Sequence, residues 1–284
     1  MTRKRILIVM PVFERELLAL NSIKSVCDNT KSTKFYDIHI VIAINKANDE
    51  LKHAMKSLPV EIIDFGENLG KGIAVNKIAA KYDFDYLISI DSDMICLDSD
   101  WILLMFNSYE LLNRARKLSV GSLCTQQIGN SCHKVTPNEN GSTKIDLNQL
   151  VINEQKRHYT NHPDRIITDL GPPNYLITQE YDGGVAGGVL MTDRHTWSLI
   201  GGYRATKLYG TDDGFYHAEC LRNKLIVGYL ERVKFYHPYE FLDEYNRWKF
   251  DVAAGDEIFE PYNTNKIYVK FNETRKLEFD GDIL

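Results

Sequence analysis

The sequence predicts an α/β protein with a Rossmann-like, mostly parallel sheet flanked by helices, and three observations predict it. Apolar, β-branched runs recur through residues 5–97, which is typical of strands buried on both faces. Segments with apolar residues at helical spacing lie between these runs. One run leads directly into two aspartates, at the kind of strand end where parallel sheets bind ligands. Strands and helices that alternate in this way are joined by right-handed crossovers.

The first half of the chain gives a regular series of elements. The uniformly apolar run at 5–12 predicts a buried strand, and apolar residues spaced three apart predict a helix at 16–27. Pro59 should end the second helix, and a glycine-bearing turn precedes the third. The full expectation is strands at 5–12, 38–44, 60–65, 86–90 and 119–124, with helices at 16–27, 49–57, 71–81 and 101–118.

The second half of the chain has a different character. Residues 125–181 are polar and contain turn signals, which predicts a long, weakly structured insertion of the kind that is usually functional or mobile. Order should resume near 183–192. Helices are then expected at 194–199 and 215–222, a strand at 225–229, and a strand-like run at 233–237.

Length and composition exclude several classes of protein. The 284 residues have a formal net charge of −5, which argues against a protein that coats nucleic acid, because that binding depends on Lys and Arg. The five cysteines are scattered and odd in number, so we expect reduced thiols and a cytoplasmic location. The early apolar run at 6–13 is too short to span a membrane, and no membrane span is expected.

The two aspartates at the end of the 86–90 run form the first candidate site. Asp91 and Asp93, separated by Ser92, can both reach one cation where the chain leaves the extended form. Such oxygen ligands suit Mg²⁺ and Mn²⁺, which diphosphate oxygens then supplement. A solvated turn that caps the next helix would contain the same residues, and the position after a buried strand is what favours function.

The turn at 68–72 offers a candidate anion site ahead of a helix. Backbone N–H groups at a helix start suit phosphate, and Lys71 adds a positive charge. The turn lacks the GK[ST] ending of a P-loop, and no GxGxxG dinucleotide pattern is present in the sequence. A plain connection between a strand and a helix would look the same.

Two more candidates come from the second half. Asp212 and Asp213 precede a predicted helix, where they could supply a general base for a hydroxyl nucleophile or simply cap the helix. His237 closes a strand-like run, and its neutral imidazole could bind Mn²⁺ or serve a structural role. The order of all four features along the chain is more specific than any one of them.

In this order the chain resembles the GT-A-fold glycosyltransferases, in particular the family 2-like nucleotide-diphospho-sugar transferases. The similarity covers roughly residues 5–237 and includes the opening strand with Pro11, Phe13 and Glu14, the segment with Asn68, Gly70 and Asn76, the Asp91-Ser92-Asp93 motif, Gly187-Gly188 through Gly201-Gly202-Tyr203, Gly210-Thr211-Asp212, and His237. It implies a GT-A catalytic domain over 1–237 and a C-terminal extension over 238–284. Within the domain, 1–124 would bind the nucleotide sugar, 125–181 would form the acceptor-side insertion, and 182–237 would form the acceptor and catalytic half.

The resemblance also implies roles for individual residues. Asp91, Asp93 and His237 would hold Mn²⁺ or Mg²⁺, and Asp212, or Asp213 beside it, would be the catalytic base. The donor would contact Pro11, Phe13, Glu14, Asn45, Asn68, Gly70, Lys71, Asn76, Asp91, Ser92, Gly187 and Gly188.

The sequence departs from the family pattern at the nucleotide-base residues, around the expected catalytic base, and at the motif of processive synthases. The acidic pair that holds the nucleotide base in the family is here Ile44-Asn45, Thr211 replaces a glutamate, and Gly214 replaces an aspartate. The Gln-x-x-Arg-Trp motif of processive synthases is missing from the sequence. Residues 246–248 match only its last two positions, Arg-Trp. A non-processive enzyme is therefore expected.

The expected reaction moves a sugar from a UDP- or GDP-sugar to a hydroxyl of a saccharide, a small molecule or modified DNA, with inversion or retention left open. A DNA acceptor would be hydroxymethylated, as for phage enzymes that glycosylate such bases. One alternative is a nucleotidyltransferase, although residues 11–15 lack the glycine-rich loop usual there. Another is a non-catalytic nucleotide-sugar-binding module, against which the joint presence of Asp91, Asp93, Asp212 and His237 argues.

Overall fold

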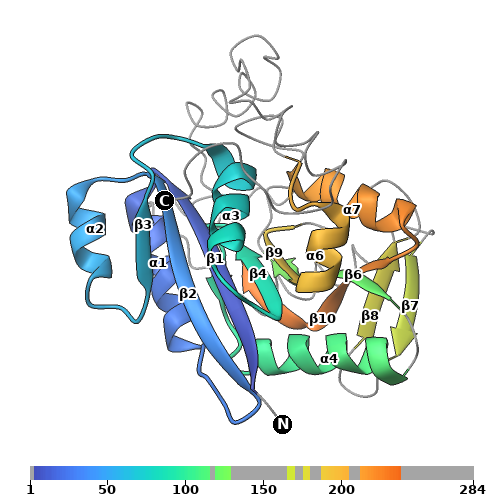
Figure 1. Cartoon of the computed structure of the whole chain (residues 1–284). Helices are drawn as coiled ribbons and strands as arrows, with labels where there is room; N and C mark the ends of the chain where they lie inside the picture. Colours follow the sequence, from blue (N-terminus) through green and yellow to red (C-terminus); the bar gives the residue numbers. More distant parts are fainter. Residues whose placement is uncertain are drawn as a thin grey trace, which may run out of the picture.

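Figure 1 shows a computed structural model of the whole chain, which describes residues 3–115, 119–128, 165–169, 175–179, 187–204 and 212–237. Most of the predicted acceptor-side insertion lies outside the described residues. So do Gly210, Thr211 and the whole of 238–284. No helix in the described part of the chain has the length and hydrophobicity that crossing a bilayer requires.

The first half of the chain folds as the sequence predicts. Its elements are β1 (Lys4–Phe13), α1 (Glu16–Asp28), β2 (Tyr36–Lys46), α2 (Asp49–Met55), β3 (Glu61–Asp64), α3 (Gly70–Lys81) and β4 (Tyr86–Ile90). The strands pair in parallel in the order β3-β2-β1-β4. All the connections between these strands contain a helix or cross the sheet, so their carboxyl ends meet at one edge.

The second half adds the elements that complete the sheet. They are β5 (Ile95–Cys96), α4 (Trp101–Ala115), β6 (Val120–Ile128), β7 (Arg165–Asp169), β8 (Tyr175–Gln179), β9 (Val189–Asp193), α6 (Arg194–Ile200), α7 (Asp212–Arg222) and β10 (Ile226–Tyr236). The full order is β3-β2-β1-β4-β9-β6-β10-β8-β7, with β5 paired to β10. β9 is antiparallel to both β4 and β6, and it joins the two halves into one sheet. The predicted fold class is thus confirmed.

Two features of the second half were not predicted in detail. Within the insertion, β7 and β8 form an antiparallel pair at the sheet edge, next to β10. The two separate runs expected at 225–229 and 233–237 form the single strand β10, whose register against β6 shifts between Leu230 and Lys234. This irregularity breaks the apolar pattern and explains why the sequence suggests two strands.

Helices cover both faces of the sheet, and each face has its own apolar core. Along β1, Ile6, Ile8 and Met10 belong to one core cluster, while Leu7 and Val9 belong to the other. The first cluster includes residues of α1 and α4, and the second includes residues of α3, α6 and α7. In Figure 1, α3, α6 and α7 lie together on the near side of the sheet. The strand is therefore buried on both faces, as its uniformly apolar sequence predicts.

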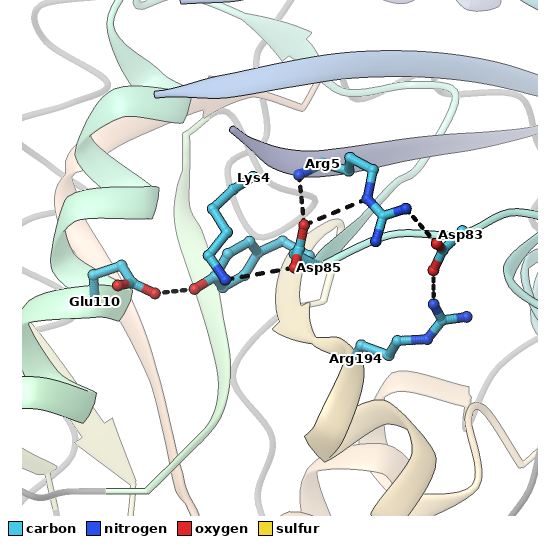
Figure 2. A network of polar contacts seen from close by, with 7 residues as sticks. Lys4, Arg5, Asp83, Asp85, Glu110 and Arg194 are labelled. Carbon is cyan, nitrogen blue, oxygen red and sulfur yellow. Dashed lines mark hydrogen bonds and ion pairs between the residues drawn. The ribbon is translucent and has the colours of Figure 1, made fainter. Parts of the chain in front are cut away.

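A network of ion pairs connects the amino ends of the central strands (Figure 2). Asp85, just before β4, accepts a hydrogen bond from the Arg5 backbone N–H at 2.8 Å and lies 3.5 Å from Lys4 Nζ. Asp83 pairs with both Arg5 and Arg194, the first residue of α6. Because Arg5, Asp83 and Arg194 are about half exposed, each pair adds little stability. The network lies at the amino ends of the strands, opposite the edge where their carboxyl ends meet.

Candidate active site

The candidate site lies at the edge where the parallel strands end. β1 ends at Phe13 and β4 leads into Asp91, while α3 begins with Gly70 and Lys71. The chain enters β9 through Gly187-Gly188, α7 begins with Asp212 and Asp213, and His237 follows β10. Residues far apart in the sequence meet here because the fold brings strand ends and helix starts to one edge.

Lys71 links the two halves of this site. Its Nζ lies 2.6 Å from Asp91 Oδ1 and 3.7 Å from Asp212 Oδ2. The same nitrogen donates a hydrogen bond to the backbone oxygen of Gly187 at 3.3 Å. Three features that the sequence suggests separately therefore come together around one ammonium group: the anion-site turn, the aspartate motif and the start of α7.

The buried charges shift one another's pKa values. Burial lowers the pKa of Lys71, but Asp91 and Asp212 outweigh it, so the net pKa lies well above its usual value and Lys71 stays protonated. Burial raises the pKa of Asp91 to about 6, while Lys71 limits the rise. Burial also raises the pKa of Asp212, again against the effect of Lys71. Of the two acids at the start of α7, Asp212 is the more basic.

Asp213 is held by backbone groups. Its Oδ2 accepts a hydrogen bond from Gly187 N–H and its Oδ1 one from Gly214 N–H, each at 2.9 Å. Burial raises its pKa, but Lys71, His217 and these N–H groups outweigh that and lower it below the usual value. Asp212 Oδ2, in contrast, is buried without a hydrogen-bond partner among the described residues. The two adjacent carboxylates thus have different surroundings and different proton affinities.

The two aspartates of the 91–93 motif face different partners. Asp91 turns to Lys71, while Asp93 Oδ2 lies 2.9 Å from Arg15 Nη1 and 3.2 Å from His237 Nε2. The turn between them is fixed by Asp91 N–H, which donates to Gly188 O at 2.8 Å, and by Met94 N–H, which donates to Asp91 O at 3.1 Å.

The predicted metal ligands are brought together in part. Asp93 and His237 lie side by side and offer an oxygen and a nitrogen, a donor set that fits Mn²⁺. In the parts of the chain that are described, no three His, Cys, Asp or Glu side chains are arranged around a common point. Asp91 is the predicted ligand that is turned away, because its carboxylate pairs with Lys71.

The predicted nucleotide side contains both exposed and supporting residues. Phe13 is partly buried, with Lys46 Nζ 5.9 Å from its ring centroid, and Glu14 Oε1 lies 2.5 Å from the same nitrogen. Pro11 is buried within β1 and is paired with Ala43. Phe13 and Glu14 are therefore the predicted residues of this strand end that have surface to offer a ligand.

Three predicted donor-binding asparagines support the site from within. Asn45 is buried and donates to Gly70 O at 3.2 Å, and Asn68 Oδ1 accepts from Gly70 N–H at 3.0 Å, which fixes the turn into α3. Asn76 is fully buried, and its amide donates to Tyr203 O at 2.9 Å and accepts from Tyr203 N–H at 3.0 Å. Since backbone groups engage both the oxygen and the nitrogen of the Asn76 amide, we assign Asn76 a structural role beside the site.

Ser92 lies in the turn between the two aspartates and is partly buried.

The structure adds two residues that the sequence reasoning missed. Arg15 reaches Asp93 from the end of β1, and a basic residue directly after the first strand was the available signal. His217 lies one helical turn after Asp213, and its Nε2 is 3.7 Å from Cys124 Sγ. Burial lowers the pKa of His217 to about 4, so the imidazole is neutral. Helical spacing from Asp213 could have indicated it.

The sheet order and the flanking helices are those of a GT-A-type fold. Residues 7–115 match the model of the family described as Glycosyl transferase family 2. A comparison with curated protein sequences finds no match. The family match and the fold together confirm the resemblance that the motifs suggest.

Solved structures show the same fold at low sequence identity. A mannosyltransferase from Pyrobaculum calidifontis, in complex with GDP-Man and Mn²⁺, has a TM-score of 0.57 at 11% identity, covering 96% of this chain and 71% of that one. A glucosyl-3-phosphoglycerate synthase from Mycobacterium tuberculosis, with Mn²⁺, UDP and glucosyl-3-phosphoglycerate, has a TM-score of 0.52 at 16% identity, covering 88% and 78%. GalNAc-T7 with UDP, GalNAc and Mn²⁺ has a TM-score of 0.56 at 13% identity, covering 95% and 55%.

Proposed function

We propose that the protein is a metal-dependent, non-processive glycosyltransferase that moves a sugar from a UDP- or GDP-sugar to a hydroxyl acceptor. The observation that carries the proposal is the position of Lys71 between Asp91 and Asp212, beside the Asp93–His237 pair. The family match over 7–115 supports it, as do neighbours whose complexes contain Mn²⁺ with GDP-Man or UDP.

The donor would lie across the strand ends. Asp93 and His237 would hold Mn²⁺ or Mg²⁺, which when bound neutralises the charge that develops on the leaving diphosphate. Lys71, protonated because of its carboxylate neighbours, would bind the same diphosphate, and Phe13 would stack on the nucleotide base. Asp91 would hold the Lys71 ammonium in position through their ion pair.

Asp212 is the better candidate for the base in an inverting transfer. Its pKa is raised, so it can accept the proton of the acceptor hydroxyl on Oδ2, beside Lys71 Nζ. Asp213 is already held by two backbone N–H groups and has a lowered pKa, which makes it a weaker base. Its contact with Gly187 instead fixes the start of α7 relative to β9.

Residues 125–181 would form the acceptor-side loop, and most of them lie outside the described residues. Saccharides, small hydroxyl compounds and hydroxymethylated DNA are the acceptor classes to compare. Assays of sugar transfer to each class, with one active donor, would separate them.

Binding and hydrolysis of nucleotide sugars test the proposal. Thermal melting with Mn²⁺ and UDP-, GDP- or CMP-sugars should show stabilisation by at least one donor. Asp93→Ala should abolish metal-dependent donor hydrolysis, while the exposed Asp37→Ala should not. Absence of stabilisation by every donor would favour the nucleotidyltransferase alternative, and stabilisation without hydrolysis or transfer would favour the binding module. Unchanged hydrolysis in a folded Asp93→Ala protein would refute the metal assignment.

A further inference from the structure

The end of β1 has an unusual backbone conformation. Glu14 and Arg15 both have positive φ angles, 53° and 56°, which side-chain-bearing residues adopt only at a cost in energy. Strain of this kind persists where the surrounding structure imposes it, and it is concentrated at functional sites. Arg15 precedes α1 but makes no capping hydrogen bond from its side chain. The side chain instead extends across the strand ends to the carboxylate of Asp93.

This ion pair uses an atom that a metal ion would need. Arg15 Nη1 lies 2.9 Å from Asp93 Oδ2, and His237 Nε2 lies 3.2 Å from the same oxygen. The Arg15 and Asp93 side chains are only 13% and 15% exposed, so water screens the pair weakly. A divalent ion held by Asp93 and His237 would compete with the guanidinium for this oxygen, and its charge would repel Arg15.

We propose that Arg15 is an exchangeable counter-ion of the metal site. It neutralises Asp93 before the donor binds, and it moves to the diphosphate when the metal takes its place. The inference rests on the proposed function, because the diphosphate is that of the donor. A guanidinium suits both partners, since its planar donors fit carboxylate and phosphate alike and it is always charged.

The exchange predicts that metal and nucleoside diphosphate bind cooperatively. Metal alone must displace Arg15 from Asp93, whereas metal with diphosphate also offers the guanidinium a second anion. Loss of the guanidinium should therefore make Mn²⁺ alone bind about tenfold more tightly, within the usual range of coupling between sites. It should also reduce, by about the same factor, the gain in Mn²⁺ affinity that a nucleoside diphosphate gives.

Mn²⁺ titration followed by electron paramagnetic resonance measures both quantities without any turnover. Free Mn²⁺ would be measured with the full chain alone and with saturating UDP or GDP, for wild type, Arg15→Gln, Arg15→Lys and Arg3→Gln. Arg3 is the matched control, because it pairs with Asp37 at 2.7 Å near the opposite end of β1. Thermal melting would confirm that each variant folds, and Arg15→Lys keeps the positive charge if Arg15→Gln does not fold.

We expect tighter binding of Mn²⁺ alone and a smaller nucleotide effect in Arg15→Gln, with Arg3→Gln equal to wild type. Arg15→Lys should keep the weak binding of Mn²⁺ alone but lose part of the nucleotide effect. If UDP or GDP strengthens Mn²⁺ binding equally in wild type and both Arg15 variants, the inference is overturned and the proposed function stands. If neither nucleotide affects wild type, the proposed donor is wrong and the inference fails with it.

Discussion

Substitution of Gly187 by alanine should separate catalysis from folding. A Cβ at this position would lie 2.4 Å from both Cβ and Oδ2 of Asp213, where ordinary contacts are 3.4–4 Å. The carboxylate cannot rotate out of the way, because its own Cβ is one of the contacted atoms. The start of α7 must therefore shift by about 1 Å, the distance by which the new contact is too short.

The size of the effect follows from that shift. Overpacking of this kind costs about 1–3 kcal/mol of unfolding free energy. A displacement of about 1 Å in a catalytic group can reduce the rate about a hundredfold. We therefore expect Gly187→Ala to lose about two orders of magnitude in sugar transfer while remaining folded at room temperature. Gly188→Ala should lose much less, because its Cβ would meet the flexible ends of Gln127 and Met94.

Steady-state transfer rates and urea unfolding on the same preparations provide the measurement. The expected result is a large fall in kcat for Gly187→Ala, with a modest loss of unfolding free energy and a smaller change in Gly188→Ala. Equal activity in wild type and Gly187→Ala would refute this prediction, since it would mean that the contact between Gly187 and Asp213 does not set the position of the proposed catalytic acids.

Three other predictions concern the free energy of unfolding. The pKa of His217 is lowered from 6.5 to about 4 by burial, so the unfolded chain binds the extra proton between these values and unfolding free energy falls as pH drops through that window. The loss reaches up to about 3 kcal/mol, and His217→Gln should remove it from urea-unfolding curves measured at several pH values. Gly214 lies in α7, and a Cβ added there would meet no atom within 4 Å. Because alanine favours a helix over glycine, Gly214→Ala should raise the urea midpoint by the equivalent of about 0.5–1 kcal/mol, and a lower midpoint would contradict this. Asn48→Ala removes the cap that accepts from Leu51 N–H at 2.8 Å and should cost about 1 kcal/mol without altering Mn²⁺ binding.

The fold of the first half could be predicted because its signals are local. Strands buried on both faces are apolar throughout, and β4 was expected with the bounds that it has, Tyr86–Ile90. β7 and β8 could not be found in this way. They are five residues each, and their place at the sheet edge depends on the pairing of β8 with β10, which is distant in sequence.

The site could be predicted as a set of motifs but not as a set of contacts. The sequence places Asp91, Asp93 and Asp212 at strand ends and a helix start, where the structure has them. It cannot show whether the amide of Asn76 faces a ligand or the backbone of Tyr203, because both uses require the same residue type. The path of Arg15 to Asp93 depends on two positive φ angles that no composition rule indicates.

The two glycines that precede β9, Gly187 and Gly188, fix the spacing between Asp91 and Asp213. Asp91 N–H donates to Gly188 O, and Gly187 N–H donates to Asp213, so the proposed donor side and the proposed acceptor side are each tied to one residue of the same dipeptide. That dipeptide leads into β9, which is paired on both sides, so the dipeptide has little freedom to move relative to the sheet. In the proposed transfer, a larger acceptor would not be accommodated by spreading the two sides apart, and the distance over which the sugar travels would stay the same from one acceptor to another.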